Sequence, residues 1–225
     1  MKKHSTASAT WSLWLATMIF GHVLCFSQEL TKGPYLVAPG STEMIVRWES
    51  DTLTEYTVSL GLDRLLTEKK RASLRGIKGD GYLYEVIMAD LKPGSQYFYQ
   101  VSSGSTKSTV ATFTTFMEKQ PTIHFVAMGD SRSNPDIFAS IINGMKKDEP
   151  DLIISMGDLV ADGGNLSEWQ TYYYDIARSV IDHIPLVSTL GDHEGENDDG
   201  ELLRHFLRTD QPTEKLWFSF DYGDA

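Results

Sequence analysis

The stretch IHFVAMGDSR, at residues 123–132, decides how the second half of this chain folds. Its apolar run, residues 123–128, predicts a buried strand that ends at the pair Gly129-Asp130. Two more apolar runs end in the same way, at Gly157-Asp158 and Gly191-Asp192. Apolar residues with helical spacing separate the three runs. Strands that alternate with helices are typical of a parallel sheet with crossover connections.

The two predicted helices between these strands have start signals of their own. Apolar residues recur with helical spacing over residues 137–145, after Asn134 as an N-cap and Pro135 as the first helical residue. A second apolar stripe covers residues 169–180. We expect Ser167 and Gln170 to open this second helix as a capping box.

The chain before this region has a different pattern. Short alternating segments, separated by turn signals such as Pro93-Gly94, predict a small antiparallel β-sandwich with Trp48 in its core. Tyr97 starts one of these segments and predicts a tyrosine corner, in which the phenol bonds to the upstream backbone. The expected strands lie near residues 44–49, 56–60, 82–88, 97–101 and 109–113.

The predicted organisation is therefore multidomain. A leader over residues 1–27 precedes an all-β sandwich over residues 31–116 and a partial α/β domain over residues 121–225. The leader has lysines at its start, an apolar core over residues 11–20 and small residues near Ser27, which predicts a cleaved signal peptide and export to the periplasm or the cell exterior. A membrane anchor is the alternative, but the apolar core is short for a full span. Lipidation of Cys25, the only cysteine, is disfavoured by the bulky Leu24 before it.

Composition narrows the possible functions. The 225 residues are 41% hydrophobic, which is typical of a globular protein. Their formal net charge of −11 argues against a partner with a polyanionic surface. We therefore expect no nucleic acid as a partner and no membrane association once the leader is removed. An acidic protein can still bind phosphate where metal ions supply positive charge.

The three strand-end aspartates are the candidate site. Carboxyl ends of parallel strands meet at one edge of the sheet, so Asp130, Asp158 and Asp192 should converge there. Two unit charges about 4 Å apart repel by roughly 4 kcal/mol at an effective dielectric of about 20. Divalent cations with oxygen ligands would remove this repulsion. The plainer alternative is that all three are turn residues with no site.

Three motifs in this order resemble those of the calcineurin-like metallophosphoesterases: GDSR at 129–132, GDLVADG at 157–163 and GDHE at 191–194. The GPYL stretch at 33–36, together with the sandwich, resembles the purple acid phosphatase-like branch of that family. Members of this branch carry a fibronectin type III-like module before the catalytic domain. The resemblance covers nearly all of the chain after the leader.

The resemblance implies a hydrolase of small phosphate mono- or diesters that uses two divalent or trivalent metal ions, such as Fe, Zn or Mn. It assigns Asp130 to the first metal, Asp158 to a position bridging both metals and Asp192 to the second metal. His193 matches the histidine that contacts phosphate and can protonate the leaving alkoxide. Arg132 is well placed to hold phosphate oxygens, with a surface-loop arginine as the alternative.

The chain departs from the family pattern at several positions. The family usually has asparagine at the position of Asp192, so this chain places an additional negative charge beside an anionic substrate. Purple enzymes have a tyrosine ligand where this chain has Ala161, so we expect no tyrosinate–iron colour. Many members have a histidine where this chain has Arg132, which leaves the first metal short of ligands. We expect Glu194 to lie behind the ligands or to face solvent.

The family's remaining metal histidines would lie beyond residue 225, so the chain resembles the N-terminal part of a catalytic domain. We expect His124 in a strand, His183 at a helix exit and His205 on a helix surface. Two alternatives to the hydrolase are a non-catalytic exported protein that binds a phosphate ligand on a degenerate scaffold, and a metal-free phosphate binder that uses the helix start after Arg132.

Overall fold

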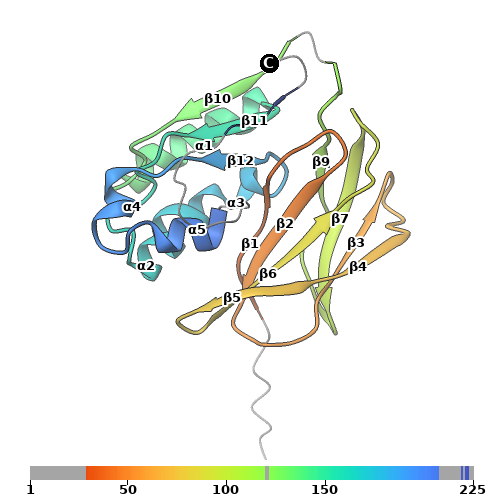
Figure 1. Cartoon of the computed structure of the whole chain (residues 1–225), viewed down its shortest axis with the longest axis horizontal. Coiled ribbons are helices and arrows are strands. Elements are labelled where there is room, and N and C mark those ends of the chain that lie inside the picture. The colour runs from red at the N-terminus through yellow and green to blue at the C-terminus, as the bar shows by residue number, and fades with distance from the viewer. Residues whose placement is uncertain (1–28, 120–121, 208–218, 220, 223–225) are drawn as a thin grey trace, which may run out of the picture.

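The computed structural model describes residues 29–119, 122–207, 219 and 221–222 (Figure 1). The predicted leader, residues 1–27, lies outside the described residues. Within the described ranges, no helix is both long and apolar enough to cross a membrane. The chain forms a β-sandwich followed by a parallel sheet with helices, and the two parts lie side by side (Figure 1). The predicted fold class is therefore confirmed.

Two antiparallel sheets form the sandwich. One has the strand order β1-β2-β6-β5, and the other has the order β4-β3-β7-β8, with β9 also paired to β7. The bounds are β1 Leu30–Val37, β2 Met44–Ser50, β3 Thr57–Gly61, β4 Glu68–Arg71, β5 Ser73–Lys78, β6 Gly81–Met88, β7 Gln96–Ser103, β8 Thr106–Lys107 and β9 Ala111–Thr114. Trp48 is fully buried and packs against the rings of Tyr56 and Tyr84, as a core tryptophan should.

The predicted tyrosine corner is present. The backbone N–H of Lys92 donates to the Tyr97 hydroxyl oxygen over 2.9 Å, which ties the turn before β7 to the strand. Strands β4 and β5 had no sequence prediction because they are polar and largely exposed, and an edge strand of this kind lacks the alternation that marks a half-buried one.

The second part contains the parallel sheet β10-β11-β12, in which all three strands run in the same direction. The strand bounds are β10 Phe125–Met128, β11 Leu152–Ser155 and β12 Leu186–Ser188. The helix bounds are α1 Pro135–Asp148, α2 Leu166–Glu168, the π-helical turn η1 Trp169–Tyr174, α3 Asp175–Ile181, α4 Asp192–Glu196 and α5 Glu201–Leu207.

The predicted start of the first helix is confirmed, whereas the predicted start of the second helix is wrong. The Asn134 side chain accepts a hydrogen bond from the Ile137 N–H and caps α1, as predicted. The second helical segment begins earlier than predicted, because the Asn165 side chain accepts from the N–H groups of Ser167 and Glu168. The predicted capping box of Ser167 and Gln170 is therefore wrong. An asparagine two residues upstream provides the acceptor instead.

Helices cover one face of the parallel sheet. Met128, Ile153 and Leu186 point to that face and share a core with α1 and α3. On the other side of the sheet, Phe125 is 50% exposed and Met156 is 63% exposed. Parallel sheets are usually covered on both faces, so these two side chains leave an apolar surface open among the described residues.

The sandwich and the α/β part share one core. Tyr35, Ile45 and Leu83 of the sandwich belong to the same buried cluster as Tyr174 and Phe206. Charged and phenolic groups of the sandwich also bind the C-terminal end of α5. The Tyr35 hydroxyl and the Arg47 Nη1 each donate to the Phe206 carbonyl over 2.9 Å. These donors satisfy carbonyl oxygens that a helix end leaves free, so the sandwich helps to hold α5 in place.

His205 is the clearest correction in this region. The sequence placed it on a helix surface, but its ring packs against Gly76 of β5 and its Nε2 atom is buried. Arg75 donates to the His205 carbonyl over 3.2 Å. The physical reason is tertiary, because α5 turns this face toward the sandwich rather than toward solvent.

Candidate metal centre

The strand-end Gly-Asp pairs meet at the carboxyl edge of the parallel sheet. The three strands run in register, so the segments that follow them leave the sheet at the same edge. Backbone hydrogen bonds then join neighbouring loops: Asp130 N–H donates to the Gly157 carbonyl over 3.3 Å, and Arg132 N–H donates to the Asp158 carbonyl over 3.1 Å.

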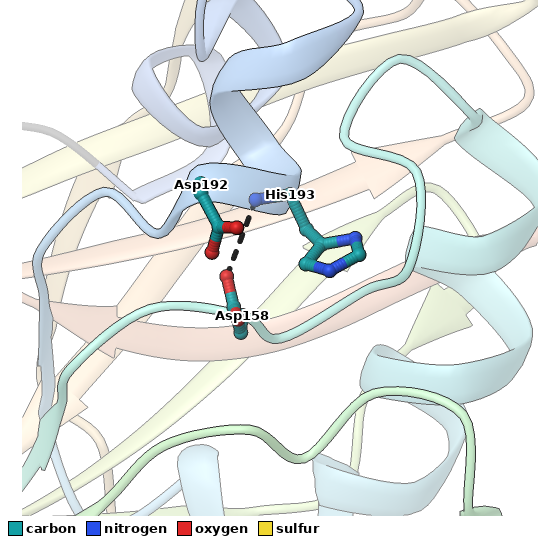
Figure 2. A group of neighbouring side chains, drawn as sticks. All are labelled: Asp158, Asp192 and His193. Carbon is teal, nitrogen blue, oxygen red and sulfur yellow. Dashed lines mark hydrogen bonds between the residues drawn. The ribbon is translucent and has the colours of Figure 1, made fainter.

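Asp158, Asp192 and His193 form the candidate metal pocket (Figure 2). Each offers one ligand atom, and these atoms lie within 4.8 Å of one another. The carboxylates of Asp158 and Asp192 face each other in Figure 2, and Asp192 is exposed to solvent. Carboxylate oxygens with one imidazole nitrogen suit a divalent or trivalent ion such as Mn, Zn or Fe. The donor set and its spacing therefore fit one metal ion.

Two glycines make this close approach possible. A Cβ added at Gly157, which has φ +93°, would lie 2.3 Å from the backbone nitrogen of Gly191. A Cβ at Gly191 would lie 2.1 Å from the Asp158 Oδ1. The backbones after β11 and β12 thus touch where their glycines stand, which brings the two aspartates together. A glycine is not required at position 129, because a Cβ added there would have the Met156 Cβ as its nearest neighbour, at 3.4 Å, which is an ordinary contact.

Asp130 and Arg132 lie at the same edge but do not belong to the three-ligand pocket. The Asp130 side chain is 78% exposed and pairs with the Arg132 guanidinium. The same Nη1 atom of Arg132 lies 2.5 Å from the Asp158 Oδ2. Desolvation alone would lower the pKa of Arg132, but the hydrogen bond to Asp130 and the charges of Asp158 and Asp192 raise it. Arg132 is therefore a fixed positive charge between the first and second aspartates.

His193 is held by the loop that follows Asp158. Its Nδ1 lies 2.7 Å from the Ala161 carbonyl, so Nδ1 carries the proton and donates it. Its backbone N–H donates to the Asp158 Oδ1 over 3.3 Å, as the dashed line in Figure 2 shows. The hydrogen bond to Ala161 raises the pKa of His193 above its ordinary value, while desolvation and the Arg132 charge act in the opposite direction. The remaining ring nitrogen, Nε2, is the one that can act on a ligand.

Glu194 is the residue whose importance the sequence left undecided. It is fully buried, and its carboxylate accepts four backbone hydrogen bonds. It therefore lies behind the ligands, and the solvent-facing alternative is wrong. One signal was available: a glutamate three residues after Gly191, at a helix start, can reach back to the backbone N–H there.

Fold and pocket together define a class: an α/β domain with candidate metal ligands at the carboxyl edge of its sheet, preceded by a β-sandwich. Comparison with known families agrees. Residues 32–115 match the model for the purple acid phosphatase N-terminal domain, and residues 123–224 match the model for the calcineurin-like phosphoesterases. The two models together span most of the chain, which belongs to the calcineurin-like phosphoesterases that carry a purple acid phosphatase N-terminal domain.

Individual proteins are similar to this chain, and for the two solved structures the similarity is one of fold. Acid phosphatase type 7 of Danio rerio is 25% identical over 204 residues, which is 83% of this chain and 45% of that protein. A purple acid phosphatase from yellow lupin (Lupinus luteus) seeds, PPD1, has a TM-score of 0.69 at 16% identity, covering 85% of this chain and 43% of that one. PhoD has a TM-score of 0.69 at 15% identity, covering 86% of this chain and 50% of that one. The chain thus spans about half the length of the proteins it matches.

Membership of this family implies a dimetal centre. Within the described part of the chain, Asp158, Asp192 and His193 fit one ion. The carboxylate of Asp130, which the resemblance assigns to the other ion, has Arg132 as its partner.

Proposed function

We propose that this chain is part of an exported, metal-dependent phosphoesterase that hydrolyses small phosphate mono- or diesters at a two-metal centre. The observation that carries the proposal is the pocket of Asp158, Asp192 and His193 at the carboxyl edge of the sheet. The leader pattern over residues 1–27 supports export. Acid phosphatase activity in the name of the Danio rerio relative supports phosphate esters as the substrate class.

The proposal concerns a parent protein longer than this chain. The matched proteins are about twice as long, and one face of the parallel sheet leaves Phe125 and Met156 open among the described residues. A further layer of structure over this face would bury those side chains and could bring additional metal ligands to Asp130.

Asp158 and Asp192 would hold the metal. The ions, when bound, supply Lewis acidity to the phosphoryl oxygens and lower the pKa of water. Arg132 orients the phosphate by donating hydrogen bonds to its non-bridging oxygens. In this proposal the two aspartates hold the metal and His193 does not: His193 carries the proton for the leaving alkoxide on Nε2, because Nδ1 is committed to the Ala161 carbonyl.

The test is hydrolysis of an aryl phosphate monoester and an aryl phosphate diester by the full-length parent protein with added Mn²⁺ or Zn²⁺. We expect turnover that requires the metal and is lost in Asp158→Asn. The matched control is Asp136→Asn, an exposed residue in the first turn of α1, which should retain the activity. A folded protein that binds a phosphate ester without turning it over would refute the hydrolase and support the non-catalytic alternative.

A further inference from the structure

The Glu194 carboxylate joins the two loops that carry the metal ligands. Its Oε2 accepts from the N–H of Asp158 over 2.8 Å and from the N–H of Gly191 over 3.0 Å. Its Oε1 accepts from the N–H of Leu159 over 2.7 Å and from the N–H of Val160 over 3.2 Å. One carboxylate therefore binds both the loop after β11 and the loop after β12.

These four bonds use the full acceptor capacity of the carboxylate. An ionised carboxylate has about four lone-pair sites, two on each oxygen, and each oxygen of Glu194 accepts two N–H groups. Glu194 is also fully buried. It cannot serve as a metal ligand without giving up some of these bonds, which separates its role from that of Asp158 or Asp192.

The loop that Glu194 holds is irregular, so its N–H groups have no ladder partners and need other acceptors. Glu168 provides the acceptor for the next two N–H groups of this loop: its Oε2 accepts from the N–H groups of Ala161 and Asp162 over 3.0 Å each. Five consecutive N–H groups, from residue 158 to residue 162, thus bind two glutamates. The Ala161 carbonyl in this segment is the partner of His193 Nδ1.

We propose that Glu194 is a positioning residue of the metal centre, which fixes the distance between Asp158 and Asp192 by binding the backbone of both loops. The inference rests on the proposed function, since it requires that this pocket binds metal. Glu194 would fix this distance through a single atom, because its Oε2 accepts hydrogen bonds from both the Asp158 N–H and the Gly191 N–H. Supporting groups of this kind typically affect metal affinity by about 10- to 100-fold.

Glu194→Gln is the sharpest test. Glutamine keeps the size of the side chain but replaces one oxygen with an NH₂ group, which cannot accept a hydrogen bond. In either amide orientation, two of the four backbone N–H groups would face this NH₂. The matched control is Glu196→Gln, the same change at an exposed position two residues further along α4.

The experiment measures Mn²⁺ binding to the full chain by isothermal titration calorimetry, at a temperature where circular dichroism shows each protein to be folded. We expect Glu194→Gln to bind Mn²⁺ about 10- to 100-fold more weakly than the wild type, and Glu196→Gln to bind like the wild type. Equal affinity of a folded Glu194→Gln would overturn the inference alone. A wild-type chain that binds no Mn²⁺ would overturn the inference, because Glu194 would then have no metal site to position; the proposed function is tested separately, by metal-dependent turnover in the parent protein.

A second measurement needs no variant and covers the case in which Glu194→Gln does not fold. Amide hydrogen exchange of the wild-type chain, read by NMR, should show slow exchange at Asp158, Leu159, Val160 and Gly191. Exchange of these four amides as fast as in an exposed loop would overturn the inference.

Discussion

His205 should make the stability of this protein depend on pH. Its ring lies between α5 and the sandwich, against Gly76, and its Nε2 is buried. Burial lowers the pKa of His205 from 6.5 to about 4, and nearby positive charges add to the effect. Those charges belong to Lys78 and Arg75 of β5, to Arg47 of β2 and to Lys32 of β1. The acidic groups of the same interface, Glu85, Glu49 and Glu201, are paired with these cations.

The direction of this pH dependence follows from comparing the pKa of His205 in the folded chain with its pKa in the unfolded chain. In the unfolded chain His205 takes up a proton near pH 6.5, whereas in the folded chain it does so only near pH 4. The contribution of His205 to stability is therefore lost as the pH falls from about 6.5 to about 4, and this contribution changes no further below that. At pH 5 the linkage gives a loss of roughly 2 kcal/mol. Solvent screening of a partly exposed ring reduces this to about 1 kcal/mol.

The assay is urea unfolding of the wild type and of His205→Gln at pH 7.5 and pH 5. Glutamine does not titrate, so the variant should lose about 1 kcal/mol less stability than the wild type between these two pH values. His124→Gln is the matched control, because His124 is exposed, and it should follow the wild type. An identical pH dependence for His205→Gln and the wild type would show that the interface does not hold His205 in its neutral form.

Three further predictions concern a buried ion pair, a close backbone contact and a hydrogen bond. Arg47→Met should lower the unfolding free energy by about 3 to 5 kcal/mol, because it breaks a buried ion pair; a loss below about 1 kcal/mol in urea denaturation would contradict this. Gly157→Ala should prevent normal folding, since the added Cβ would lie 2.3 Å from a backbone nitrogen. The same change at Gly144, which has nothing within 4 Å, should leave the melting temperature unchanged or raise it, with a gain of up to about 1 kcal/mol; equal melting temperatures for the two variants would refute the close-contact argument. Tyr97→Phe should cost about 1 kcal/mol in chemical denaturation by removing the acceptor for the Lys92 N–H, and an unchanged midpoint would show that the tyrosine corner adds no stability.

The local sequence pattern was sufficient to predict much of the fold. The apolar runs before Gly129, Gly157 and Gly191 are strands of one parallel sheet, as their composition and spacing predict. The cap of α1 at Asn134 and the corner at Tyr97 also follow from residues close in sequence. These features depend on side-chain period and on bonds within a few residues, which a single stretch of sequence encodes.

The predicted convergence of the strand-end aspartates was met only in part. Strand order places Asp158 and Asp192 at one edge, and the structure brings them together with His193. The sequence could not show that Asp130 would pair with Arg132 instead of joining this pocket. That outcome depends on where a long, flexible arginine side chain ends, which periodicity does not encode.

The sequence by itself determined the order of the domains, the class of the fold and the three acidic strand ends. Only the tertiary structure decided the roles of Glu194 and His205. Glu194 became buried because four N–H groups from two loops meet around it, and His205 became half-buried because α5 packs on the sandwich. In both cases the partners are distant in the chain, and burial of an ionisable group is stable only where such partners converge.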